Sequence, residues 1–186
     1  MSTVNIIYFL LGSLVIGVMS WKSLKNPSSH GFYRFFAFEL LLLLIIVVSP
    51  DWFEDTFSLN QQMSWLILII SLMLIVHSTT LLIVMGLPQN SRPGTGSPNL
   101  AFENTTQLVV VGIFRFIRHP MYASVVLLTF GIFLKSPSFV TAGLGLVATI
   151  FLYIAARVEE KENVAYFGNE YLNYMKKTKM FIPFLF

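Results

Sequence analysis

Five long apolar runs, separated by short polar breaks, dominate the pattern of the chain. Each run approaches the roughly 20 residues that an α-helix needs to cross a bilayer. Proline and serine in the breaks are typical of turns between helices. The expected fold is therefore all-α, an integral membrane helical bundle of about five transmembrane helices whose last two form a helical hairpin. The predicted helices cover residues 4–21, 32–49, 63–86, 119–134 and 138–156.

The composition also indicates a membrane protein. The chain is 55% hydrophobic and only 11% charged, whereas a soluble domain carries about 25% charged residues. No basic segment precedes the first apolar run, so we interpret it as a spanning helix rather than a removable signal. The absence of cysteine excludes disulfides and cysteine-ligated metals, and the histidines show no metal-ligand spacing. A net charge of +3 is too small for a nucleic-acid groove. We expect neither metal nor nucleic acid.

We expect a single domain over residues 1–186, with three helices in residues 1–86 and a loop, the hairpin and a C-terminal segment in residues 87–186. Eleven of the twelve basic residues fall on one side of this topology, and Lys135 alone falls on the other. The positive-inside rule places the basic side in the cytosol. The chain is thus expected to be a multi-pass membrane protein with its candidate site facing the cytosol.

The candidate chemistry lies at the mouth of the predicted hairpin. Residues 118–122 read RHPMY where a polar loop enters the fourth helix, and Glu159 and Glu160 lie where the fifth helix returns. Pro120 suits the first turn of a helix, and the free N–H groups there favour an anion. Because the two arms have similar lengths, the two motifs should meet. An ion-pair cluster that only anchors helix ends is the structural alternative.

The sequence LVVVGIFRFIRHPMY at residues 108–122 resembles the "LV..G.Y...RHP.Y" signature of isoprenylcysteine carboxyl methyltransferases and their phospholipid methyltransferase relatives. A second block continues the resemblance, with EE at 159–160, FGNEYLNY at 167–174 and IP at 182–183. The resemblance covers about residues 99–184. The first three helices match only in being apolar.

This resemblance implies S-adenosyl-L-methionine as the methyl donor. It suggests that His119 and the N–H groups of the fourth helix hold the donor carboxylate and that Glu159 holds its ammonium or ribose hydroxyls. Asn99 aligns with a further polar contact. Catalysis would rest on alignment of donor and acceptor, with Glu160 as a candidate base for an amine acceptor. The implied cofactor contacts are Thr106, Gln107, Leu108, Val109, Phe114, His119, Pro120, Met121, Tyr122 and Glu159.

Two positions depart from the family pattern. Phe114 replaces a tyrosine and keeps only the ring, and Ala155 stands where prenylcysteine enzymes have an arginine for the substrate carboxylate. Arg157 is the nearest basic residue and our candidate for substrate binding. The expected function is S-adenosylmethionine-dependent methyl transfer to a lipidic acceptor, with isoprenylcysteine-type carboxyl O-methylation ahead of phospholipid amine N-methylation. The expected partners are the lipid bilayer and a membrane lipid or prenylated substrate.

More remote alternatives are an NADPH-dependent sterol-reductase-like enzyme and a non-enzymatic membrane scaffold. Two polar residues inside the apolar runs remain open between function and structure. Glu39 is costly in a membrane unless it is paired, and His77 belongs to a polar patch for which bonding between helices is the usual explanation. Around Gly168 we expect a bend that leads into a packed, partly amphipathic C-terminal segment.

Overall fold

The computed structural model describes residues 3–89 and 100–183. The predicted contact at Asn99 lies outside these residues. Every helix predicted from the apolar runs is present, and a sixth follows them. Three short 3-10 helices complete the secondary structure, η1 (Ser49–Asp51), η2 (Ala101–Glu103) and η3 (Gly112–Arg115). The α-helices are α1 (Thr3–Leu24), α2 (His30–Val48), α3 (Leu59–Met85), α4 (Pro120–Phe133), α5 (Phe139–Phe167) and α6 (Asn169–Lys177).

Four of these helices, α1, α2, α3 and α5, are long and apolar enough to cross a membrane. The protein is therefore a multi-pass integral membrane protein with four candidate spans. Helix α4 is apolar but has only 14 residues, or about 21 Å of rise, against a hydrocarbon core of about 30 Å. A total of five crossings and a transmembrane hairpin of α4 with α5 stay predictions.

Local sequence explains where the helices begin and end. The hydroxyls of Ser58 and Ser138 cap α3 and α5, and Pro120 occupies the first position of α4. Helix α5 continues to Phe167, well past the end predicted at residue 156. The apolar pattern marks only its membrane part, whereas the charged residues that follow are good helix formers. Gly168, with φ +58°, separates α5 from α6, which confirms the predicted bend.

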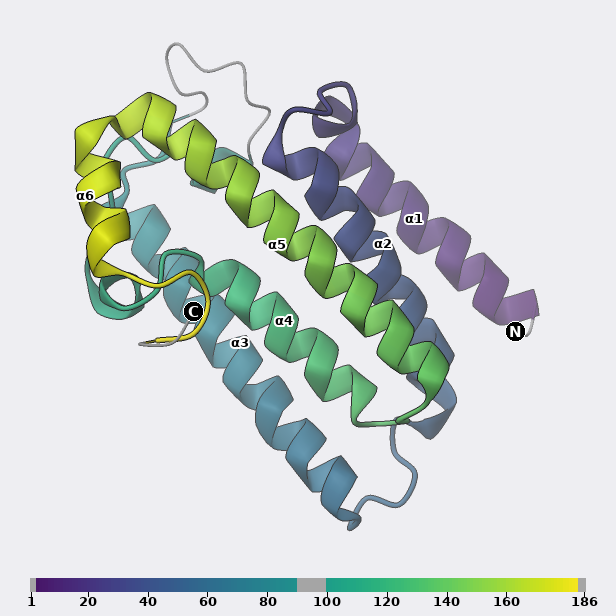
Figure 1. The fold of residues 1–186 in the computed structure, drawn as a ribbon. Helices are drawn as coiled ribbons and strands as arrows, with labels where there is room; N and C mark the ends of the chain where they lie inside the picture. The colour runs from purple at the N-terminus through teal and green to yellow at the C-terminus, as the bar shows by residue number, and fades with distance from the viewer. Residues whose placement is uncertain (1–2, 90–99, 184–186) are drawn as a thin grey trace.

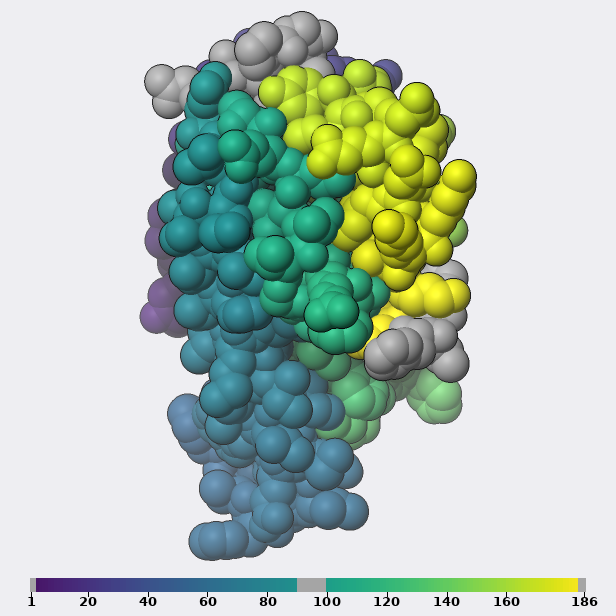
Figure 2. Space-filling view, turned by 90° about the vertical axis from the view of Figure 1, so that its left-hand side faces the viewer, coloured from purple at the N-terminus to yellow at the C-terminus, as the bar shows by residue number. Residues whose placement is uncertain are grey.

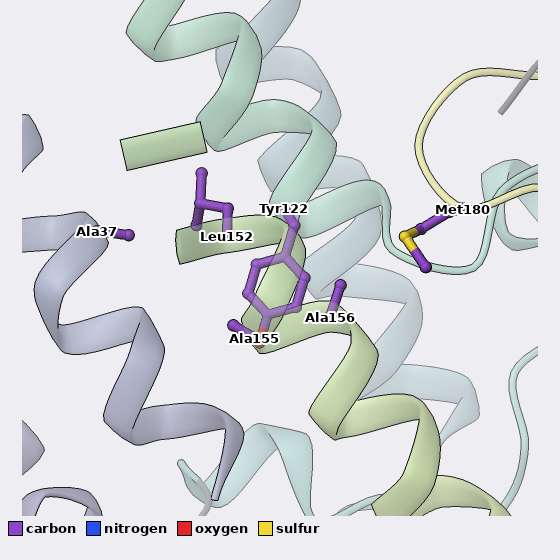
Figure 3. Close-up of a cluster of buried hydrophobic side chains, with 6 residues drawn as sticks. All are labelled: Ala37, Tyr122, Leu152, Ala155, Ala156 and Met180. Carbon is purple, nitrogen blue, oxygen red and sulfur yellow. The ribbon is translucent and has the colours of Figure 1, made fainter. Parts of the chain in front are cut away.

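The helices pack as pairs around α4 and α5. Helix α2 lies along α5, α3 lies along α4, and α1 lies at the edge of the bundle against α2 (Figure 1). Ala37 of α2 and Ala155 and Ala156 of α5 are fully buried, so that small side chains allow the two backbones to approach. These alanines share a core cluster with Tyr122, Leu152 and Met180 (Figure 3).

Polar contacts inside the bundle tie particular helices together. Ser64 and Ser71 of α3 donate to the carbonyl oxygens of Gly131 and Ser124 of α4 (both 2.7 Å), and Glu39 of α2 accepts from Ser13 of α1. Glu39 therefore forms a hydrogen bond between α1 and α2. In the patch around His77, Ser78 donates to carbonyls of its own helix rather than to a neighbouring one.

Lys135 occupies the end of the bundle opposite the start of α4. It is 5% exposed, donates to Gln61 Oε1 (2.8 Å) and lies 3.7 Å from the centroid of the Trp65 ring. Burial lowers its pKa. The one basic residue that the sequence places on the far side is thus held by an aromatic and amide contact.

Candidate active site

A cavity forms at the end of the bundle where α4 begins. Its wall draws on α2, α3, η2, the segment before α4, α4 itself, α5 and α6. Residues from α2, in the N-terminal half, and from α6, near the C-terminus, therefore meet here. Its polar and charged lining residues are Arg34, Glu103, Thr105, Arg118, His119, Tyr122, Glu159, Asn163, Tyr171 and Tyr174.

The start of α4 forms one wall of the cavity. His119 is the N-cap and Pro120 the first helical residue, and the first intrahelical bond runs from Ala123 N–H to His119 O (2.9 Å). The N–H groups of Met121 and Tyr122 precede that bond and therefore need other partners. The His119 ring is buried, and its Nε2 makes no hydrogen bond. This wall can hold an anionic group.

The two sequence motifs meet, as the hairpin lengths predicted. Arg118 Nε donates to Glu160 Oε1 (2.7 Å), and His119 Nε2 lies 3.7 Å from the same oxygen. Arg118 also donates through Nη1 to the carbonyl oxygens of Met175 (3.2 Å) and Thr178. Because this guanidinium donates its hydrogen bonds to Glu160 and to the end of α6, Arg118 links α5 to α6.

Glu159 faces the cavity from α5, while Glu160 is buried in its ion pair. Within the described residues no ion pair reaches Glu159. The buried Tyr122 hydroxyl also lines the cavity and makes no hydrogen bond of good geometry. Glu159, which has no ion pair within the described residues, therefore lines the same cavity as the first turn of α4, whose N–H groups have no intrahelical acceptor. This arrangement suits a ligand that carries both charges.

A second charged wall comes from α2 and η2. Arg34 donates to Glu103, and both line the cavity. Burial opposes ionisation of Glu103, but Arg34 and His30 outweigh burial and lower the pKa of Glu103 to about 2. His30 in turn contacts Glu162 of α5 (Nδ1 to Oε2, 2.6 Å). The sequence did not predict this wall, because no regular spacing relates His30, Arg34, Glu103 and Glu162. The only indication in the sequence was that charged residues flank the apolar helices.

Helix α6 closes the cavity with two tyrosines. Tyr171 and Tyr174 are buried and line it, and the Tyr174 hydroxyl donates to Phe114 O (2.7 Å). Burial raises the pKa of both hydroxyls. Beyond α6, Arg118 N–H donates to Lys179 O (2.8 Å) and His119 N–H to Met180 O (3.1 Å). Figure 2 shows this C-terminal segment, in yellow, lying against the green segment that precedes α4.

Most of the residues expected at a cofactor site line this cavity. The two exceptions adjoin it: Thr106 and Gln107 donate their backbone N–H groups to Gly86 O (2.9 and 3.2 Å), and the neighbouring Thr105 lines the wall instead. The eight predicted residues that do line it are Leu108, Val109, Phe114, His119, Pro120, Met121, Tyr122 and Glu159.

The residues proposed to act on the acceptor lie further away. The Arg157 side chain is 54% exposed, with Nη1 3.7 Å from Glu160 Oε2, and it does not line the cavity. Glu160, the candidate base, is engaged by Arg118 and is likewise absent from the lining. Ala155 is fully buried in the core between α2 and α5. Their predicted roles stay predictions.

Comparison with known proteins places this site in a family. A family model described as phospholipid methyltransferase matches residues 66–170. The chain is 35% identical over 74 residues to a methanethiol S-methyltransferase of Crocosphaera subtropica, which is 39% of this chain and 28% of that protein. It is 33% identical over 75 residues to one of Pseudomonas deceptionensis, or 39% of this chain and 27% of that protein.

The chain therefore spans less than a third of the length of these two relatives. No solved structure matches it. The family match covers more than half of the chain and includes all of α4 and α5 and the residues around His119 and Glu159. The chain belongs to the phospholipid methyltransferase family.

Proposed function

We propose that this protein transfers a methyl group from S-adenosylmethionine to an acceptor that enters the cavity from the membrane. One observation supports the proposal: the N-terminus of α4, whose first N–H groups have no intrahelical acceptor, lines the same cavity as Glu159, which has no ion-pair partner in the described chain. An amino acid headgroup carries the complementary carboxylate and ammonium.

The described residues fit such a donor. Met121 N–H, Tyr122 N–H and His119 would hold its carboxylate, and Glu159 would hold its ammonium. The apolar Leu108, Val109 and Phe114 offer a wall for the adenine ring. Once bound, the donor supplies an activated methyl group on a positively charged sulfur. The task left to the protein is therefore alignment, which can lower a bimolecular barrier by several kcal/mol, up to about 10.

The charges around the cavity disfavour an acceptor whose reacting group is a carboxylate. Arg34 is paired with Glu103 and Arg118 with Glu160, and residue 155 is a buried alanine. A carboxylate acceptor would therefore lack a ready cation, and its desolvation would be costly. We infer that the amine headgroup of a membrane lipid leads as acceptor over the prenylcysteine carboxyl group expected from the sequence.

Access from the bilayer is consistent with this acceptor. Phe38 of α2 and Ile75 and Leu82 of α3 line the cavity with apolar side chains. These residues belong to candidate membrane spans, so a hydrocarbon tail would meet apolar surface while its headgroup lies in the polar part of the cavity. Carboxyl O-methylation is the second candidate, since the exposed Arg157 lies at the same end of α5 and could turn toward an acceptor carboxylate.

Donor binding tests the proposal directly. Calorimetry of the detergent-solubilised protein with S-adenosylhomocysteine should show binding that Glu159→Gln and His119→Ala each weaken about tenfold or more, since each removes a charged or buried hydrogen-bond partner. Arg115→Gln, at an exposed arginine outside the cavity, should bind like the wild type. No binding, or binding of NADPH instead, would sink the proposal.

A second experiment identifies the acceptor. Labelled methyl from S-adenosylmethionine is offered with amine-headgroup lipids, a prenylcysteine and methanethiol in separate reactions. We expect product in the amine lipids. Product in prenylcysteine alone would restore carboxyl methylation as the leading function, and product in methanethiol alone would make the acceptor a thiol, as the names of the two relatives state for those proteins.

A further inference from the structure

Four charged side chains join α2 to η2 and α5 in one buried network. His30 Nδ1 lies 2.6 Å from Glu162 Oε2, and the His30 backbone N–H donates to Glu162 Oε1 (3.2 Å). Arg34 donates to Glu103, and His30 Nε2 lies 3.6 Å from Glu103 Oε2. Each of the four side chains is at most 15% exposed. Two cationic groups thus face two carboxylates across three elements.

The network reaches the donor site at two points. Arg34 and Glu103 line the cavity, and Glu103 also accepts the Leu100 N–H (2.9 Å), which fixes the turn that brings Leu100 and Phe102 into the wall. On the other side, Glu162 follows Glu159 by about one turn of α5. The hydrogen bonds between His30 and Glu162 therefore fix how α5 is rotated about its own axis. This rotation directs Glu159 toward the cavity.

The two members on α2, His30 and Arg34, precede the stretch that matches the family, residues 66–170. We propose that Arg34 is a positioning residue of the donor site: with His30, Glu103 and Glu162 it latches the turn at residues 100–103 and the Glu159 face of α5 into the geometry that binds the donor. This inference rests on the proposed function. It assigns the N-terminal part of the chain a role in the site beyond crossing the membrane.

Packing alone does not account for the network. Helices α2 and α5 already contact each other through Ala37 and Ala155, and a buried ion pair is often no more stabilising than apolar side chains of similar volume. Directional charged hydrogen bonds instead select one arrangement among several of similar packing. Because Arg34 pairs with the Glu103 carboxylate that also accepts the Leu100 N–H, losing Arg34 should loosen the turn at residues 100–103.

The test compares Arg34→Gln with Arg115→Gln, the same substitution at an exposed arginine away from the cavity. Hydrogen exchange of the ligand-free protein should show faster exchange at residues 100–103 in Arg34→Gln only. Its dissociation constant for S-adenosylhomocysteine should rise about tenfold, the loss expected for one charged hydrogen bond, and the donor KM should rise more than kcat falls. Arg34→Lys, which keeps the charge, should recover part of both effects.

Two results would overturn the inference. One is an Arg34→Gln protein with wild-type exchange at residues 100–103 and wild-type donor affinity. The other applies if Arg34→Gln does not fold: an Arg34→Lys protein indistinguishable from wild type in both measurements. A wild-type protein that binds no S-adenosylhomocysteine would instead defeat the proposed function, while the exchange comparison, which needs no ligand, would still decide whether the latch exists.

Discussion

At the scale of single residues, the site is defined by polar groups whose hydrogen bonds inside the protein are incomplete. His119 Nε2 and the Tyr122 hydroxyl are buried and make no hydrogen bond of standard geometry, although each faces a carboxylate, Glu160 and Glu159 respectively. Glu159 has no ion-pair partner in the described chain. A buried polar group without a good hydrogen bond costs free energy. Their neighbours Arg118 and Glu160 satisfy each other instead. Polar groups with incomplete hydrogen bonds are thus available for a ligand, whereas the Arg118–Glu160 ion pair stabilises the fold.

Tyr122→Phe tests this division, because it removes one buried hydroxyl and keeps the ring stacked on His119. We expect the free energy of unfolding to change by less than about 1 kcal/mol, since the hydroxyl makes no hydrogen bond of standard geometry. Affinity for S-adenosylhomocysteine should fall several-fold. Denaturant unfolding and calorimetry measure the two effects. A clear loss of stability would mean that the hydroxyl has a partner in the folded protein.

At the scale of elements, the site depends on how α5 ends. The helix runs past the membrane part to present Glu159, Glu160 and Glu162, and Gly168 then turns the chain so that α6 returns over the cavity. The positive φ of Gly168 is a conformation that side chains disfavour. The turn at Gly168, rather than the apolar pattern of the sequence, therefore positions Tyr171 and Tyr174 in the cavity wall.

Gly168→Ala and Gly143→Ala form a matched pair for this turn. A Cβ added at either position meets no atom within 4 Å, but only Gly168 has a positive φ. Gly168→Ala should therefore destabilise the protein by about 1 kcal/mol or more, whereas Gly143→Ala, inside α5, should stabilise it by up to about 1 kcal/mol. Thermal unfolding in detergent compares them. Equal shifts would show that the bend does not need glycine.

At the scale of the whole molecule, buried charges couple distant segments, and this coupling makes stability depend on pH. The pKa of Glu103 is lowered to about 2 from 4.5. Because the folded value is the lower one, the stabilisation is fully present above pH 4.5 and is lost as the pH falls toward 2. Glu103→Gln should be less stable at neutral pH by about 3 kcal/mol.

The difference between wild type and Glu103→Gln should then shrink between pH 4.5 and 2. Denaturant unfolding in detergent across this range measures it. The exposed Glu170→Gln is the control, for which the difference should be near zero throughout. A gap between wild type and Glu103→Gln that stays constant with pH would show that Glu103 is not stabilised in its ionised form.

The orientation of the bundle is a further property of the whole molecule. The chain has no cysteine, so single cysteines report on sidedness with a membrane-impermeant maleimide. We expect Glu170→Cys, beside the site, to be labelled only from the cytosolic side and Glu54→Cys, in the exposed link between α2 and α3, only from the other. The positive-inside rule predicts this outcome, and the reverse pattern would place the site outside the cytosol.

The sequence by itself determined the membrane class, the five apolar helices, the start of the fourth helix near His119 and the meeting of residues 118–119 with Glu160. These features follow from apolar periodicity, proline geometry and segment length, which are local properties of the chain. Eight of the residues expected at the donor site also line the cavity. Seven of these eight residues were expected from the family resemblance of one continuous segment, residues 108–122.

Only the tertiary structure decided which charged groups satisfy each other. Arg34 with Glu103, His30 with Glu162 and Arg118 with the end of α6 are contacts between segments far apart in the chain, and no sequence spacing encodes them. Burial then sets which carboxylate stays available, because a charge removed from water must find a partner. The assignment of Glu159 to the cavity and of Glu160 to the ion pair rests on that constraint.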